Sequence, residues 1–376
     1  MTGPLTGLRF VEMAGIGPAP FAAMVLADLG ATGIRIESPR AGLAVGDPLG
    51  DVTRRGRESV VVDLRRDEGR DLVLDLISGA DVLIEGFRPG VMERLGLGPH
   101  ESLQRQPSLV YGRMTGWGQD GPWAHAAGHD LDYIAIAGVL AHTARRGQPP
   151  TPPLNLVGDY GGGAMLLIVG ILAALWEAQR SGQGQVVDAA MVDGAALLMS
   201  LFHSMSAQGL WQEETGVNLL DSGAPFYDVY RTADGKWLAV ACLEPQFYAE
   251  WLRIANLADA DLPAQFDVSR WDDLRRAFAD VVATKTRDEW AVLADRTDAC
   301  VAPVLTMSEA PAHPHLAARG TFIDINGLVQ PAPAPRFSRT APDVPTPVSA
   351  PRRDTLIDWG VDADRVLSLA DSGVIG

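Results

Sequence analysis

Two short motifs place acid/base side chains in glycine-rich surroundings. His129 directly precedes Asp130 in the run Gly128–Tyr133, behind a loop rich in glycine and proline. Asp159 lies further along the chain, just before Gly161–Gly163. Catalytic groups concentrate on loops that a rigid scaffold positions. An imidazole and a carboxylate on opposite faces of one carbon could remove a proton from one face and return a proton to the other.

Each of these residues also has a structural interpretation. A single histidine is more often a hydrogen-bonded structural residue than a catalyst. Asp130 and Asp132 can cap or open a helix over residues 131–138, and Asp159 can cap the helix that follows it. The functional interpretation of Asp159 is a carboxylate at a helix N-terminus, which a ligand approaches closely because the following glycines have no side chains. Glu244, at the start of another expected helix, is adequate as a first-turn acid.

Composition narrows the class of protein. The chain has 376 residues, of which 47% are hydrophobic and 21% charged, as is ordinary for a soluble globular enzyme. A net charge of −16 argues against a nucleic-acid partner, because phosphate binding needs a basic face. A local group of arginines could still bind a phosphorylated ligand, or could simply be a solvated charged face. This arginine cluster consists of Arg54, Arg55, Arg57, Arg65 and Arg66.

Cysteine use and hydropathy predict a cytoplasmic protein that needs no metal or membrane. The 2 cysteines, Cys242 and Cys300, stand in apolar contexts and lack the spacing of a zinc site. Residues 1–8 lack the basic and apolar regions of a signal peptide. The longest apolar run, residues 164–176, is too short to cross a bilayer and predicts a buried helix.

The first half of the chain alternates short apolar runs with helical patterns, which predicts a parallel sheet covered by helices. We expect a Rossmann-like large domain of the α/β class. The expected strands are residues 8–12, 33–37, 59–64, 81–85, 108–114 and 186–189. The expected helices are residues 21–29, 67–78, 90–95, 164–180 and 191–208.

The second half predicts a smaller α+β domain. Two strands, residues 225–231 and 236–241, flank the hairpin signal Thr232–Gly235. Expected helices follow at residues 246–254, 271–283 and 287–293. Residues 313–351 are rich in proline and alanine, which is typical of an extended segment, and a closing helix is expected over 355–369. The predicted domains are 1–188 (large), 189–224 (linker helices), 225–318 (small) and 319–376 (a return segment and C-terminal helix on the large domain).

The run Ala14–Pro20 imitates a dinucleotide-binding fingerprint, because it follows a strand and Glu37 ends the next strand. Proline replaces the third glycine, and two prolines stiffen the turn where backbone amides should face a pyrophosphate. We therefore interpret it as a tight strand-to-helix turn rather than a nicotinamide site.

Several motifs together carry a family resemblance that extends to about Arg339. They are Gly15–Pro20, Met24–Gly30, Arg88–Pro99, Met114–Gly121, Gly128–Tyr133, Pro153–Gly163, Gly184–Gly194, Ala224–Tyr227, Glu244–Tyr248 and Thr297–Leu305. With these motifs the chain resembles the α-methylacyl-CoA racemases, within the family III CoA transferase superfamily.

The resemblance implies a reaction and a site. His129 and Asp159 would be the two acid/bases at Cα of a 2-methylacyl-CoA thioester, so that (2R) and (2S) forms interconvert through an enolate. Asp130 would open the helix whose backbone amides stabilise the enolate oxygen, and Glu244 would hydrogen-bond near His129. The resemblance also implies an interlocked homodimer in which Glu244 comes from the partner subunit. It implies no metal or redox cofactor, since coenzyme A is part of the substrate.

The same resemblance implies residues that hold the CoA moiety. The family has a basic residue just after the second strand, where this chain has Ser38, so Arg40 is expected to substitute. Another departure is Asp132, which stands where the family commonly has Asn. The expected CoA-binding residues are Arg40, Val61, Val62, Asp63, Leu64, Arg88, Arg94, Gly128 and Tyr133.

Two alternative functions remain. A CoA transferase of the same fold would use the aspartate at the position of Asp159 as a nucleophile and would not need His129. A non-catalytic acyl-CoA-binding protein would need none of His129, Asp159 and Glu244. The presence of all these residues favours the racemase.

Overall fold

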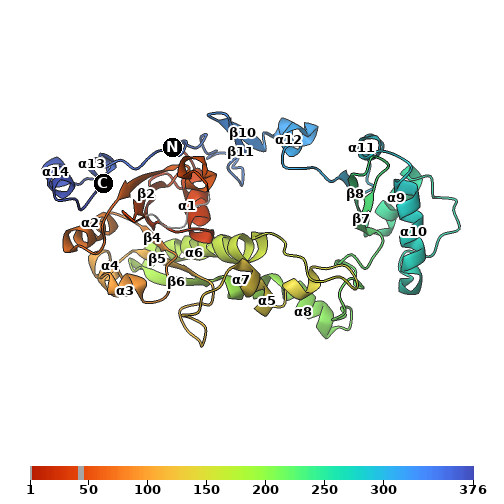
Figure 1. Cartoon of the computed structure of the whole chain (residues 1–376), viewed down its shortest axis with the longest axis horizontal. Coiled ribbons are helices and arrows are strands. Elements are labelled where there is room, and N and C mark those ends of the chain that lie inside the picture. Colours follow the sequence, from red (N-terminus) through yellow and green to blue (C-terminus); the bar gives the residue numbers. More distant parts are fainter. Residues whose placement is uncertain (1, 41–45) are drawn as a thin grey trace. The chain divides into compact units, whose positions relative to one another are not determined.

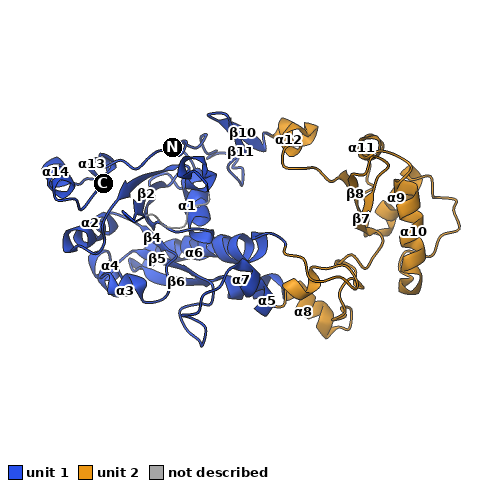
Figure 2. Cartoon of the chain, in the orientation of Figure 1, with its two compact units in different colours: residues 1–137, 153–199, 320–376 blue, residues 138–152, 200–319 orange. Residues whose placement is uncertain are grey.

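The computed structural model describes residues 2–40 and 46–376, which divide into two compact units (Figure 2). Unit 1 consists of Met1–Ala137, Pro153–Met199 and Gly320–Gly376, and unit 2 of Gly138–Pro152 and Ser200–Arg319. The chain thus leaves unit 1 twice and returns to it twice.

Unit 1 is built on a 6-stranded sheet with the order β3-β2-β1-β4-β5-β6 (Figure 1). All neighbouring strands pair in parallel, as the alternating pattern predicts. This order is that of a doubly wound sheet, in which ligands bind at the carboxyl ends of the strands near the point where the order reverses. The strands are β1 (Arg9–Met13), β2 (Thr32–Glu37), β3 (Arg57–Val61), β4 (Val82–Glu85), β5 (Val110–Thr115) and β6 (Gln185–Ala190).

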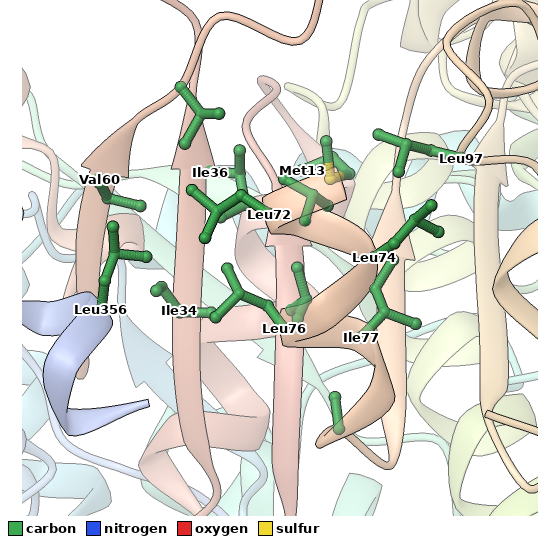
Figure 3. Packing of buried hydrophobic residues seen from close by; sticks show 14 of the residues in the cluster. Met13, Ile34, Ile36, Val60, Leu72, Leu74, Leu76, Ile77, Leu97 and Leu356 are labelled. Atoms are coloured by element: carbon green, nitrogen blue, oxygen red, sulfur yellow. The ribbon is translucent and has the colours of Figure 1, made fainter. Parts of the chain in front are cut away.

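Helices cover both faces of this sheet. They are α1 (Pro18–Asp28), α2 (Asp67–Ser78), α3 (Val91–Arg94), α4 (Pro99–Arg105), α5 (Asp130–Ile136), the π-helix η4 (Leu156–Ala164), α6 (Met165–Ser181) and α7 (Met191–Leu198). On one face, Leu72 and Leu76 of α2 pack over Ile34 and Ile36 of β2, as Figure 3 shows. The opposite core cluster joins α1 and α6 to strands β1, β4 and β5.

Helix α6 is less buried than the sequence predicts. Its apolar residues were expected to be buried all round, yet Val169 is 58% and Trp176 is 66% exposed. One face of α6 packs on β5 and β6, and this contact uses only part of the apolar surface. The continuous helix Leu156–Ser181 is long and apolar enough to cross a membrane, but a core helix of a soluble α/β protein passes the same test. Its hydropathy is therefore weak support for a membrane span.

The returning C-terminal part of unit 1 contains more regular structure than expected. A hairpin of β10 (Phe322–Ile325) and β11 (Leu328–Pro331) lies where the sequence predicts an extended segment. The closing helix is split into α13 (Thr355–Asp358) and α14 (Ala363–Asp371), because Gly360 adopts φ 89° between them. Leu356 of α13 joins the same core cluster as Val60 and lies beside it (Figure 3).

Unit 2 is an α+β structure, as predicted. Its 3-stranded antiparallel sheet has the order β7-β8-β9. Trp251, Phe278 and Trp290, from three different helices, pack against this sheet in one aromatic core. The elements are α8 (Ser200–Ala207), β7 (Tyr227–Arg231), β8 (Trp237–Ala241), α9 (Pro245–Ile254), α10 (Trp271–Val282), α11 (Arg287–Ala294), β9 (Val301–Pro303) and α12 (Pro314–Arg319).

Candidate active site

His129 is held at the start of helix α5. It is the N-cap residue, with extended backbone angles of φ −133° and ψ 173°, and it is exposed. The carboxylate of Asp132 accepts a hydrogen bond from the backbone N–H of His129 at 2.9 Å. This is half of a capping box, in which an acid at the third helical position bonds back to the N-cap amide. Asp132, whose effect the sequence left open, therefore has a capping role.

Asp130 connects this helix to the second acid/base segment. Its side chain is only 7% exposed, and its Oδ1 accepts a hydrogen bond from the backbone N–H of Asp159 at 2.7 Å. The approach is so close that a Cβ added to Gly158 would lie 2.5 Å from this oxygen. The resemblance implies that Asp130 opens the helix whose backbone amides stabilise the enolate oxygen, so the link made by its side chain is a new finding.

Asp159 lies on the π-helix η4 rather than at a conventional helix cap. π-Helices are rare and are frequently found at functional sites. The side chain is half-buried, and its Oδ2 accepts a hydrogen bond from Nδ2 of Asn155 at 3.0 Å. Sequence reasoning missed Asn155, although an amide one helical turn before a candidate acid is a usable signal.

The surroundings of Asp159 favour its protonated form. Burial raises the pKa of the Asp159 carboxyl, because a charge loses solvation there. The negative charge of Asp130 raises this pKa further, while the Asn155 hydrogen bond and the charge of His129 lower it. The two predicted acid/base residues thus lie on segments that the hydrogen bond between Asp130 and the Asp159 N–H joins, and the charge of His129 acts on the Asp159 carboxyl.

Aromatic packing supports the base of helix α5. Tyr133 is 5% exposed, and its ring meets the ring of Trp117 edge-on, with 4.8 Å between centroids. Burial raises the pKa of Tyr133 to about 12, so its hydroxyl stays protonated at neutral pH. Gly128 allows this packing, since an added Cβ would lie 2.8 Å from the Tyr133 ring. Gly128 and Tyr133 thus support α5. Their predicted contact with CoA stays a prediction.

The turn between β1 and α1 lies against the Asp159 carboxylate. Gly17 has φ 72°, and a Cβ added to it would lie 3.3 Å from Oδ2 of Asp159. Arg88 follows β4 and Arg40 follows β2, so both also lie beyond the carboxyl ends of strands. Strands β1 and β4 flank the point where the sheet order reverses, which is where a doubly wound sheet binds its ligand, and β2 is the next strand beside β1.

The three predicted phosphate-binding arginines differ from the arginine cluster. Arg40, Arg88 and Arg94 are exposed, and within residues 2–40 and 46–376 none of them forms an ion pair with a carboxylate. Every member of the arginine cluster does form an ion pair with a carboxylate. Its buried members are therefore neither a phosphate-binding site nor a solvated charged face. The pairs are Arg54 with Glu37, Arg55 with Asp28, Arg57 with Glu12, Arg65 with Asp63, and Arg66 with Glu68.

The segment Val61–Leu64, whose residues are expected to bind CoA, is partly covered by the C-terminal residues of the chain. Val62 is fully buried and bridges to Ile375, and the N–H of Asp63 donates to the carbonyl of Val374 at 2.9 Å. Val61, Asp63 and Leu64 are half-buried. Of the four residues in this segment, only these three have side-chain surface that a ligand could contact.

Glu244 belongs to unit 2. It is the N-cap residue of α9, where Pro245 occupies the first helical position, and its side chain is exposed. Its predicted partnership with His129, which belongs to unit 1, stays a prediction.

Comparison with known proteins identifies the family. The profile of CoA-transferase family III matches residues 5–354, so the chain belongs to this family. A CaiB/BaiF family protein from Brucella suis has a similar structure, with a TM-score of 0.82 and 25% identity over 96% of this chain and 100% of that chain. A hypothetical protein from Mycobacterium tuberculosis gives a TM-score of 0.77 and 27% identity over 94% of this chain and 99% of that chain. The predicted fold class is confirmed.

Within the family, the chain is similar to racemases in particular. An α-methylacyl-CoA racemase from Mus musculus is 44% identical over 99% of this chain and 97% of that protein. The α-methylacyl-CoA racemase from Homo sapiens is also 44% identical, over 91% of this chain and 88% of that protein. A succinyl-CoA–D-citramalate CoA-transferase from Chloroflexus aurantiacus is 31% identical over 86% of this chain and 84% of that protein.

Because the pKa of Asp159 is raised, we expect its ionised form to lower the stability of the folded protein. A carboxyl with a raised folded-state pKa destabilises the folded protein once it ionises, so Asp159→Asn should have a higher Tm than the native chain near pH 7.5. The gain should shrink as the pH falls toward the ordinary value of 3.8, below which the carboxyl is protonated in both the folded and the unfolded states. Thermal unfolding of both proteins from pH 4 to pH 8 measures it.

Asp63→Asn is the matched control of opposite sign, because the hydrogen bond from Arg65 lowers the pKa of Asp63. This variant should lose Tm at neutral pH. A loss of Tm in Asp159→Asn that is the same at every pH would contradict the account of Asp159.

Proposed function

We propose that the protein is a racemase that interconverts (2R)- and (2S)-2-methylacyl-CoA thioesters by proton transfer at Cα. The observation that carries this proposal is the placement of His129 and Asp159 on two segments joined by the Asp130 hydrogen bond. The 44% identity to α-methylacyl-CoA racemases supports the same activity. A CoA transferase, the alternative within the family, would have no use for the imidazole of His129.

The proposed mechanism uses one acid/base group on each face of the substrate. His129 removes the α-proton of one enantiomer, and the electron pair of the broken C–H bond moves into the thioester carbonyl to give an enolate. Protonated Asp159 then delivers its proton to the opposite face, which inverts Cα. Its raised pKa suits this step, because a general acid must hold its proton near the working pH. In the reverse direction the two residues exchange roles.

The backbone at the start of α5 is proposed to stabilise the enolate oxygen. The N–H groups of Asp132 and Tyr133 both donate to the carbonyl of His129. In the described parts of the chain, those of Asp130 and Leu131 have no acceptor. Free amides that point at a developing negative charge lower the barrier to enolisation. Proton transfer of this kind calls for neither a metal nor a redox cofactor.

The assignment is tested by isotope exchange. One enantiomer of a 2-methylacyl-CoA incubated with the protein in D2O should incorporate deuterium at Cα and lose optical purity, as followed by mass spectrometry and chiral analysis. His129→Ala and Asp159→Ala should each slow both processes by about 10²–10⁴-fold, the usual effect of losing an acid/base group. His125→Ala, which removes an exposed histidine from the same loop, should leave the rate unchanged.

The alternative functions give different results in this experiment. A transferase would leave Cα unlabelled and would move CoA to an added acceptor acid. A binding protein would do neither. Unchanged exchange in His129→Ala or Asp159→Ala would refute the assignment of that residue.

Arg88 and Arg94 are proposed to bind the phosphates of the CoA moiety, together with Arg40. Their support is that all three are exposed and lack a carboxylate partner in the described residues. Arg88→Ala and Arg94→Ala should raise KM for the acyl-CoA about 5- to 30-fold with little change in kcat, because each loses a charged hydrogen bond of ~1–2 kcal/mol. Arg65→Ala, an exposed arginine paired with Asp63, is the control and should leave KM unchanged.

The protein is further proposed to be an interlocked cytoplasmic homodimer, in which the partner subunit supplies Glu244 to the site. The exposed apolar face of α6, with Val169 and Trp176, supports an additional partner, because exposed apolar patches mark interfaces. The 2 cysteines are free, which suits a reducing compartment.

Complementation between variants tests this arrangement. His129→Ala and Glu244→Ala should each be nearly inactive alone, but their co-expression should restore part of the exchange activity. In mixed dimers, one site would combine native His129 and Asp159 from one chain with native Glu244 from the other. If Glu244 serves the His129 of its own chain, no mixed dimer contains an intact site, and no activity returns.

A further inference from the structure

The turn between β1 and α1, which sequence analysis sets aside as a nucleotide site, borders the acid/base carboxylate. Gly17 is the N-cap residue of α1 and lies against Oδ2 of Asp159. Helix α1 also packs against the π-helix η4 that carries Asp159. A helix N-terminus at this place would normally donate backbone N–H groups to a carboxylate and lower its pKa.

The first turn of α1 lacks most of these donors. Pro18 occupies the first helical position and Pro20 the third, and proline has no backbone N–H. The turn also lacks a side-chain cap and contains no acidic residue. In the described residues, the only hydrogen bond to the Asp159 carboxylate comes from Asn155. The helix therefore covers the carboxylate without solvating it.

Two buried arginines hold the turn in this position. Nη2 of Arg35 donates to the carbonyl of Gly15 at 3.1 Å, and Nη2 of Arg57 donates to the carbonyl of Pro20 at 3.3 Å. Both arginines pair with the buried carboxylate of Glu12. Their charges are thus engaged within the sheet, and neither contributes to the electrostatics of Asp159.

We propose that the Gly15–Pro20 turn is a positioning element that sets the proton affinity of Asp159, with Pro18 and Pro20 withholding the amide donors that a helix N-terminus would otherwise supply. This inference rests on the proposed role of Asp159 as an acid/base. The other groups that act on Asp159 are Asn155 on its own helix and His129 and Asp130 from α5, and Tyr133 of α5 also interacts with its charge.

Pro18→Ala restores one backbone N–H in the first turn of α1, directly after Gly17, and Pro20→Ala restores another in the same turn. Either change should favour the ionised form of Asp159, so the acid limb of the kcat/KM profile for the enantiomer deprotonated by Asp159 should move down by about one pH unit. The rate at the pH optimum should fall because the acid/base is less well matched to the working pH. Pro99→Ala changes a proline at the first position of α4 and is the matched control, with an unchanged profile expected.

A stability cycle separates this effect from simple loss of structure, and it needs no substrate. In the native background, Asp159→Asn should raise Tm at pH 7.5. In the Pro18→Ala or Pro20→Ala background this gain should shrink, whereas in the Pro99→Ala background it should be unchanged. If a proline only stabilises the helix, replacing it with alanine should lower Tm by the same amount with and without Asp159→Asn.

Equal gains in all backgrounds, together with unmoved pH profiles, would overturn the proposal. Because the cycle reports the proton affinity of Asp159 directly, it gives an answer even if the protein exchanges no α-proton. The two proline variants are independent tests. If one of them fails to fold, the other still tests the proposal.

Discussion

The site depends on one partly buried hydrogen bond, from the backbone N–H of Asp159 to the carboxylate of Asp130. This bond joins the start of α5 to the π-helix, two segments far apart in the chain. His129 directly precedes Asp130, so the same contact fixes the imidazole relative to the second carboxylate. Gly158 is required for it, because any larger residue would collide with the Asp130 oxygen. A buried carboxylate that lost this donor would cost free energy, which keeps the two segments together.

The same arrangement separates two kinds of charge in unit 1. Buried carboxylates such as Glu12 on β1 and Asp28 at the end of α1 are paired with arginines and hold the fold together. Within the described residues Asp159 forms no ion pair with an arginine, and its raised pKa destabilises the ionised form but suits proton transfer. Beyond the carboxyl ends of the strands, Arg40 and Arg88 form no ion pair with a described carboxylate, and their proposed role is to bind a negatively charged ligand. Charged residues that hold the fold together are thus in ion pairs, whereas those proposed to act on the substrate are not.

Much of the fold follows from local pattern in the sequence. The alternation of apolar runs and helical segments predicts the parallel sheet, because strands buried on both faces read as continuous apolar runs. The Asn326-Gly327 pair is a hairpin signal that predicts β10 and β11, but the proline-rich surroundings obscured it. Gly360 likewise marks the break between α13 and α14. The exposed face of α6 was not predictable from its own residues, because apolar periodicity does not reveal whether the cover comes from the same chain.

The candidate site is predictable only in part. The glycine and proline context identifies His129 and Asp159, and the resemblance to a family gives them roles. No local pattern predicts that the Asp130 side chain would bond to the Asp159 amide, or that the Gly15–Pro20 turn would border the same carboxylate, since these contacts join segments distant in sequence. The π-helix was also missed, because its apolar and glycine residues read as the start of an ordinary helix.

The central claim is that His129 and Asp159 act on opposite faces of one carbon. The most direct measurement is a crystal structure with an unreactive 2-methylacyl-CoA analogue bound. The account predicts the analogue's Cα between the two side chains, with the imidazole and the carboxylate on opposite faces and the carbonyl oxygen at the start of α5. An analogue with both groups on the same face of Cα, or with the Asp159 carboxylate directed at the carbonyl carbon as a nucleophile, would contradict it.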